Sequence, residues 1–199
     1  MRQVLCLGAH CDDIEIGCGG LLQNLPREAS VRAVVFSGNE TRVGETHRAL
    51  ELLAGHTNLQ IQNLTFNDGF FRSDWAEIKR RFEKLKTLSN PDLILTHTRE
   101  DLHQDHQVLS ELTWNTYRDN LIFEYEILKY DDDLGSPSVF LPISEDQAIK
   151  KAETIVTSFV SQGDKTWMTE DAFLALLRVR GVQCQTRFAE AFCVRKFAL

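Results

Sequence analysis

The stretch that most constrains the fold is "QVLCLGAHCDDIEIGCGG", residues 3–20, where an apolar run ends in a histidine, a cysteine and two adjacent aspartates. The run "VLCLG" has the composition of a buried strand bounded by glycine. The glycine-rich "IEIGCGGLLQNL" that follows is predicted to form a helix beginning just after the acidic residues. Because adjacent carboxylates repel each other, such a loop needs a compensating group, and a divalent cation would supply it.

Strand and helix patterns then alternate along the chain. Buried strands are predicted for "VRAVVFSG" and "PDLILTHT", and helices for "GETHRALELLAG", "DWAEIKRRFEKLKTL" and "HQVLSELTWNTYR". In the second of these helices, Asp74 and Glu77 have the spacing of an N-terminal capping box. This alternation predicts an α/β fold, a Rossmann-like and mostly parallel sheet with helices on both faces.

The last third of the chain continues the pattern less regularly. "LIFEYEIL" is predicted to be a strand, and "QAIKKAETIVTSFV" and "TEDAFLALLRVRG" are predicted to be helices. Between them, "YDDDLGSPSVFLPISED" is expected to dock as an irregular, ordered crossover. The sequence shows no internal repeat and no low-complexity segment, so we expect residues 1–199 to form a single domain.

Composition limits the classes of partner. The net charge of −7 argues against affinity for nucleic acid or anionic membranes. No apolar run approaches the roughly 20 residues that span a bilayer. The first residues enter a strand-like segment rather than a signal-peptide pattern, and the five cysteines form no CxxC pair. We therefore expect a cytoplasmic protein without a disulfide framework.

Two loops are expected to meet at one edge of the sheet, because ligands bind at the carboxyl ends of parallel strands. The residues in question are His10, Asp12 and Asp13 in the first loop, and Asp101, His103, Asp105 and His106 in "THTREDLHQDHQ". Imidazole and carboxylate together suit Zn²⁺, and a catalytic zinc site takes three protein ligands and keeps one position open. The joint occurrence of both loops predicts a metal site.

Each motif, taken alone, also has an interpretation that involves no metal. The glycines at 17, 19 and 20 could form a nucleotide-binding turn, although they do not fit GxGxxG and two carboxylates would repel a pyrophosphate. "HQDH" could be a solvated helix start. Cys11 is expected to be a packing residue rather than a nucleophile, and His97 to support the site rather than bind metal.

Taken together, these motifs resemble those of the zinc-dependent N-deacetylases of the PIG-L/LmbE type. "AHCDDIEIGCGG" is similar to their AH-P-D-D motif with its glycine-rich helix start, and "HQDH" matches their later HxDH. The likeness extends to "RFAEAFCVRKF" near the C-terminus, while Cys11 stands where proline is usual. The resemblance implies an enzyme that removes acetyl from an N-acetylglucosamine-type sugar or sugar conjugate, releasing acetate and a free amine.

The resemblance also assigns roles. The implied metal ligands are His10, Asp13 and His106, for Zn²⁺ or another divalent metal, and the implied catalytic residues are Asp12, His103 and Asp105. Asp12 would be the general base, and His103 would stabilise the tetrahedral oxyanion as a cationic donor. Asp105, helped by Asp101, would orient His103 and favour its charged form.

Arg42 and Glu45 in "TRVGE" resemble an Arg-x-x-Glu pair near the family's pocket and are expected to bind substrate. The expected partner is a small acetylated amino sugar or conjugate, with no nucleic acid and no membrane, and the resemblance leaves open a homo-oligomer. Two alternatives remain at this stage. One is a metal-dependent hydrolase of another amide or of a phosphoester, and the other is a non-catalytic sugar- or nucleotide-binding module.

Overall fold

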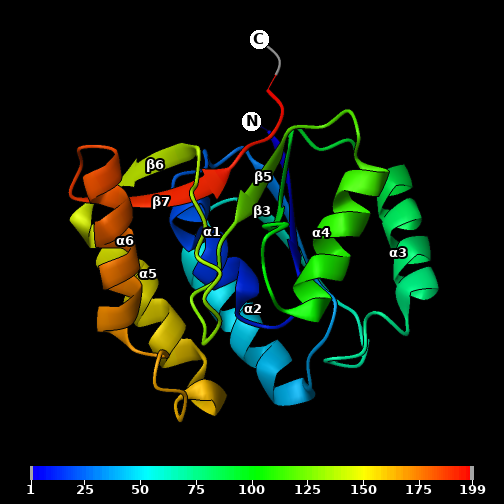
Figure 1. The fold of residues 1–199 in the computed structure, drawn as a ribbon, viewed down its shortest axis with the longest axis horizontal. Coiled ribbons are helices and arrows are strands. Elements are labelled where there is room, and N and C mark those ends of the chain that lie inside the picture. Colours follow the sequence, from blue (N-terminus) through cyan, green and yellow to red (C-terminus); the bar gives the residue numbers. More distant parts are fainter. Residues whose placement is uncertain (1, 198–199) are drawn as a thin grey trace.

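A computed structural model describes residues 2–197 and shows a seven-stranded sheet with the order β3-β2-β1-β4-β5-β7-β6 (Figure 1). The strands are β1 (Gln3–Gly8), β2 (Ser30–Val35), β3 (Asn58–Asn63), β4 (Leu93–His97), β5 (Ile122–Tyr125), β6 (Val139–Ile143) and β7 (Phe188–Cys193). The helices are α1 (Asp13–Gln23), α2 (Glu40–Ala54), α3 (Trp75–Leu88), α4 (Gln104–Thr116), α5 (Glu145–Ser158) and α6 (Glu170–Gln183), with a 3₁₀ turn η1 (Val160–Gln162).

The sheet is mixed, with its parallel part at the N-terminal end of the chain. Strands β3, β2, β1, β4 and β5 run parallel, whereas β7 pairs antiparallel with both β5 and β6. Helices α3 and α4 lie together on one side of the sheet, and α1, α2, α5 and α6 lie on the other (Figure 1). The predicted α/β fold, mostly parallel and covered on both faces, is confirmed.

The arrangement of β1 and β4 positions the candidate site. These strands are parallel neighbours, with Leu5 opposite Ile94, yet the helices that follow them pack on opposite faces. The carboxyl ends of β1 and β4 thus form the topological switch point of the sheet, where open α/β sheets bind ligands.

Two strands differ from the sequence-based expectations. Residues 139–143, which we expected to be irregular, form edge strand β6, and β3 was not predicted. Pro142 removes one backbone donor from β6, which an edge strand tolerates. The order of β6 comes from its antiparallel pairing with β7, a contact between distant residues that local pattern does not encode.

Helix starts show a second difference. Asp74 occupies the N-cap of α3 but makes no side-chain cap hydrogen bond, so the predicted capping box with Glu77 is absent. A capping box forms instead at α5, where Ser144 and Gln147 exchange side-chain and backbone hydrogen bonds.

The glycines of α1 serve packing rather than phosphate binding. A Cβ at position 17 would lie 2.2 Å from Cδ2 of Tyr125, and one at position 20 would lie 2.8 Å from Cδ of Glu190. Helix α1 is kinked at Cys18, and the buried Glu190 carboxylate accepts the N–H groups of Gly20 and Leu21, each at 2.6 Å. The glycine-rich stretch thus lets β5 and β7 approach the helix closely.

In the described part of the chain, no helix has both the length and the apolar character needed to cross a membrane.

Candidate metal centre and active-site cavity

The loops after β1 and β4 bring three donor side chains together. Nδ1 of His10 lies 3.1 Å from Nε2 of His106 and 3.5 Å from Oδ2 of Asp13. Nε2 of His106 lies 3.5 Å from Oδ1 of Asp13, so the three donors form a compact triangle. All three residues are buried, with exposed fractions of 7% for His10 and 2% for the other two.

The backbone at the start of α1 separates the two adjacent aspartates. Asp12 has a φ of 110°, in the left-handed region that non-glycine residues seldom adopt, and it immediately precedes the helix. Asp13 begins α1 and accepts the backbone N–H of His10 at 2.7 Å. The strained turn directs Asp13 toward the histidines and leaves Asp12 at the cavity wall, a cost typical of functional sites.

His106 is oriented by Asp101. Its Nδ1 lies 2.8 Å from Oδ2 of Asp101, which leaves Nε2 directed at Asp13. Burial lowers the pKa of His106 to about 4, so the imidazole is neutral near pH 7, the form that binds metals.

The carboxylate of Asp105 contacts His10 rather than His103. Its carboxylate accepts the backbone N–H groups of Gly69 and Phe71 and lies 3.2 Å from Nε2 of His10. The expectation that the Asp105 carboxylate orients His103 is therefore corrected: the carboxylate contacts His10, and only the backbone N–H of Asp105 contacts His103. A second carboxylate, that of Asp68, lies 3.1 Å from the same nitrogen of His10.

His103 is held by the backbone and is not set up as a cation. It occupies the N-cap of α4, where its Nδ1 accepts the backbone N–H of Asp105 at 3.3 Å. Burial lowers the pKa of His103, and the charge of His10 lowers it further. The expected cationic donor is corrected to a neutral imidazole, whose Nε2–H is the group that can donate.

His97, at the end of β4, supports the donor triangle from inside the protein. Its ring stacks on that of His106 with centroids 3.8 Å apart, and its Nε2 lies 3.2 Å from Oδ2 of Asp13. The same nitrogen accepts the backbone N–H of Ala9 at 3.1 Å. These contacts fit the supporting role expected from the sequence.

Asp12 faces the cavity beside a basic residue. The guanidinium of Arg42 donates to Oδ2 of Asp12 at 2.9 Å and also to the carbonyl oxygen of Cys11. Burial raises the pKa of Asp12 to about 7, although the Arg42 charge opposes this shift. A carboxyl group that titrates near neutral pH suits a general base.

Glu45 and Cys11, the other two residues near Arg42, have structural rather than catalytic contacts. Glu45 is buried away from the cavity lining and accepts hydrogen bonds from the backbone N–H and hydroxyl of Ser161, at 2.8 and 2.6 Å. The expectation that Glu45 binds substrate is thus replaced by a contact that ties α2 to η1. Burial raises the pKa of the Cys11 thiol to about 12, which agrees with a packing role.

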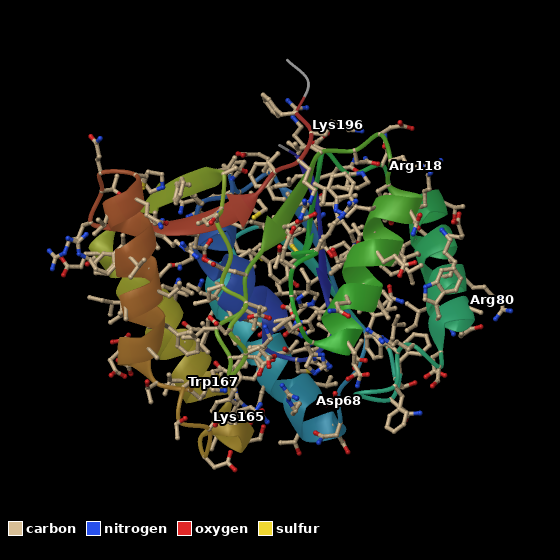
Figure 2. The ribbon with its side chains drawn as sticks, in the orientation of Figure 1. Asp68, Arg80, Arg118, Lys165, Trp167 and Lys196 are labelled. Carbon is tan, nitrogen blue, oxygen red and sulfur yellow. The ribbon has the colours of Figure 1, made fainter. Side chains whose placement is uncertain are left out.

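A cavity of about 260 Å³ opens beside the donor triangle. Its wall also includes residues that sequence reasoning missed, namely Asp68, Ile127, Lys129, Tyr130, Asp131, Lys165 and Trp167. Asp68, Lys165 and Trp167 gather at the same end of the molecule in Figure 2. They lie in connecting segments, where no helix or strand periodicity marks them in the sequence.

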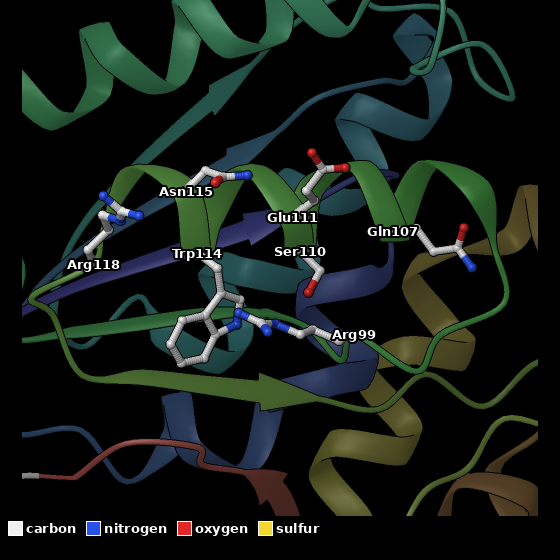
Figure 3. Close-up of a pocket in the computed structure, with 7 residues that line it drawn as sticks. All are labelled: Arg99, Gln107, Ser110, Glu111, Trp114, Asn115 and Arg118. Atoms are coloured by element: carbon white, nitrogen blue, oxygen red, sulfur yellow. The ribbon is translucent and has the colours of Figure 1, made fainter.

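A separate hollow of about 630 Å³ lies along the outer face of α4 (Figure 3). Arg99 covers the ring of Trp114 there, with its Cζ 4.4 Å from the centroid. The residues that line this hollow include neither histidine nor aspartate, so its chemistry differs from that of the donor triangle.

The donor set fits a zinc ion. Two imidazoles and one carboxylate, backed by Asp101 and Asp105, match the ligand chemistry of catalytic zinc sites. Although burial opposes it, hydrogen bonds to Asp105, Asp13 and Asp68 raise the pKa of His10, so this imidazole would release a proton on binding a metal. Three groups of possible ligands overlap the triangle: His10 with His103 and His106, Asp13 with His97 and His106, and His10 with Asp68 and Asp105. Nε2 of His97 already accepts the backbone N–H of Ala9. Nδ1 of His10 faces the triangle, whereas its Nε2 faces Asp68 and Asp105. We therefore assign His97, Asp68 and Asp105 as supports of the triangle rather than as ligands.

Fold and donor set together define a class of α/β proteins with a histidine–aspartate cluster at the switch point of the sheet. Residues 5–117, more than half of the chain, match the family described as PIG-L, GlcNAc-PI de-N-acetylase. The chain therefore belongs to the PIG-L family, and the resemblance inferred from the sequence motifs is confirmed.

Other proteins resemble the chain in part of the sequence or in the fold. An uncharacterized deacetylase, YaiS of Escherichia coli K12, is 29% identical over 115 residues, 53% of this chain and 62% of that protein, so the match spans less than two thirds of its length. N,N'-diacetylchitobiose deacetylase from Pyrococcus horikoshii is 19% identical, with a TM-score of 0.73 over 98% of this chain and 84% of that one. GalB, a 4-carboxy-2-hydroxymuconate hydratase from Pseudomonas putida KT2440, is 17% identical, with a TM-score of 0.81 over 100% and 98%.

Proposed function

We propose that the chain is a zinc-dependent N-deacetylase that removes acetyl from an N-acetylglucosamine-type sugar or sugar conjugate. The observation that carries this proposal is the triangle of His10, Asp13 and His106 beside Asp12 in a 260 Å³ cavity. Family membership supports the reaction class. The proposal includes one catalytic domain over residues 1–199 and a cytoplasmic location, which suits five free cysteines.

The proposed division of labour follows from the contacts. His10, Asp13 and His106 would hold the metal, which when bound polarises a carbonyl and makes water more acidic. Asp12 accepts the proton of the attacking water, and Arg42 keeps its carboxylate at the cavity wall. His103 donates its Nε2–H to the amide oxygen as negative charge develops there. The leaving amine takes its proton from Asp12, which holds the proton taken from water, because a neutral His103 has no acidic proton to give.

The fold alone does not select the reaction, because the same fold is shared with a hydratase. Hydrolysis of another amide or of a phosphoester, and a non-catalytic sugar- or nucleotide-binding module, are the rival functions. The intact pairing of a buried donor triangle with a carboxylate poised near neutral pH favours a hydrolytic enzyme over a binding module.

The test combines metal analysis with a substrate panel. We expect about one zinc per chain, loss of acetate release after chelation, and recovery when zinc is added back. The panel contains N-acetylated sugars, acetylated amino acids, a phosphodiester and an unsaturated hydroxy acid as a hydration substrate. Acetate release confined to the sugars supports the proposal, whereas turnover of another class alone, or a protein that takes up no metal, contradicts it.

A further inference from the structure

An aromatic and basic wall faces the cavity from two segments that carry none of the proposed metal ligands. Tyr130 lies in the connection between β5 and β6, and Lys165 and Trp167 lie between η1 and α6. Lys165 and Trp167 are adjacent at the end of the molecule that also holds Asp68 (Figure 2). The proposed mechanism uses none of these three wall residues.

Trp167 is fixed in place but has an unused donor. Its ring makes edge contacts with Phe173, at a centroid distance of 6.3 Å, and with Tyr130, at 6.4 Å. Within residues 2–197, its buried indole N–H has no hydrogen-bond partner. This nitrogen is inaccessible to solvent, so Trp167 offers the cavity its ring surface.

Lys165 differs from the other basic residues of the cavity. Arg42 is paired with Asp12, and Lys129 lies within ion-pair distance of Asp101 and Asp133. The ammonium of Lys165 lies 5.1 Å from the ring centroid of Trp167 and makes no ion pair with the described residues 2–197. Among the described residues, its ammonium thus has the Trp167 ring but no carboxylate as a close partner at the cavity wall.

The base of this wall is anchored to the same helix that positions Asp12. Glu45 on α2 holds Ser161 in η1 through two hydrogen bonds, and Arg42 lies one turn earlier on α2. Lys165 and Asp12 line the same cavity, and these hydrogen bonds tie the segment before Lys165 to α2.

We propose that Lys165 and Trp167 form a specificity subsite for an anionic substituent, a carboxylate or a phosphate, attached to the sugar whose acetamide lies at the donor triangle. The apolar face of a sugar ring packs on an indole, and the ammonium supplies a charge-assisted hydrogen bond to the anion. The assignment rests on the proposed deacetylase function for the location of the acetamide.

Three glycosides of N-acetylglucosamine that differ in one group test the subsite. They are the methyl glycoside, which is neutral, the carboxymethyl glycoside and the 2-phosphoethyl glycoside. The zinc-loaded protein is compared with Lys165→Gln, Lys165→Arg and Lys84→Gln, the last of which removes an exposed lysine on α3, distant from the cavity. For each combination of protein and glycoside, we measure kcat/KM for acetate release and the dissociation constant from calorimetry.

We expect Lys165→Gln to reduce the preference for an anionic over the neutral glycoside about tenfold, because a charge-assisted hydrogen bond is worth roughly that factor. Lys165→Arg should restore most of the preference, and Lys84→Gln should leave it unchanged. The anionic glycoside whose preference decreases more in Lys165→Gln identifies carboxylate or phosphate as the natural group. An equal decrease for neutral and anionic glycosides, or no decrease, overturns the subsite.

Binding separates this inference from the proposed function. If no glycoside releases acetate, the deacetylase proposal fails, yet the calorimetric preference for the anionic glycoside and its loss in Lys165→Gln still decide the subsite. Trp167→Phe gives a second readout, because the variant loses the N–H donor and one of three tryptophans. We expect it to abolish the fluorescence change on glycoside binding, and a retained change would contradict contact with Trp167.

Discussion

The carboxylate of Asp101 lies 2.8 Å from Nδ1 of His106, on the side of the ring opposite the nitrogen that faces Asp13. Asp101 is nearly inaccessible and also accepts the backbone N–H of His103 at 2.8 Å. One carboxylate thereby fixes the tautomer of a proposed metal ligand and the start of the helix that carries it.

Asp101→Asn should lower zinc affinity about 10- to 100-fold, because supporting carboxylates of this kind raise the basicity of the ligand imidazole. Competition with a chromophoric chelator measures the affinity. Asp133→Asn is the matched control, since Asp133 also contacts Lys129 but not His106. Equal affinities in the two variants would remove Asp101 from the metal site.

His103→Ala should reduce turnover roughly 10²–10³-fold while zinc content stays near that of the unaltered protein, because a lost oxyanion donor acts on the transition state. The substitution also removes the N-cap of α4, a contribution of about 1 kcal/mol. His103→Asn keeps a capping side chain and separates the two effects. If zinc content fell with turnover, His103 would become a ligand.

Much of the site could be predicted from the sequence, because its donors lie in two short loops that each follow a strand. The loops after β1 and β4 each contain their donors within a few residues, and parallel neighbouring strands bring their carboxyl ends together. The partners of the histidines could not be assigned in this way. Asp105 is adjacent to His106 in α4, so its side chain points about 100° around the helix toward the segment of Gly69.

The cavity wall was beyond sequence reasoning for a different reason. Asp68, Lys165 and Trp167 lie in irregular connections whose positions depend on distant contacts such as Glu45 with Ser161. Strand β6 is another case, since its order depends on β7, about 50 residues later in the chain. Period and capping signals describe local preference and do not report such contacts.

Lys151→Met should destabilise the fold by about 3–5 kcal/mol, because it leaves the buried carboxylate of Glu190 without its cation. The ammonium lies 2.6 Å from Oε1 of Glu190 and donates to the carbonyl oxygen of Ile16 at the same distance. Urea unfolding gives the free energy, and Lys150→Met, at the exposed neighbouring position, is the control. Equal midpoints would show that Gly20 and Leu21 alone satisfy the carboxylate.

The two adjacent aspartates should separate metal binding from proton transfer. Asp13 lies within 3.5 Å of His10 and His106, so Asp13→Asn should weaken zinc binding and lose activity, with partial recovery at high zinc. Asp12 lies 2.9 Å from Arg42 at the cavity wall, so Asp12→Asn should keep the zinc but lose the base, a decrease of roughly 10²–10⁴ in rate. Zinc content and acetate release are measured for both variants side by side. The reverse pattern would exchange the two roles, and full activity in both variants would refute the hydrolase proposal.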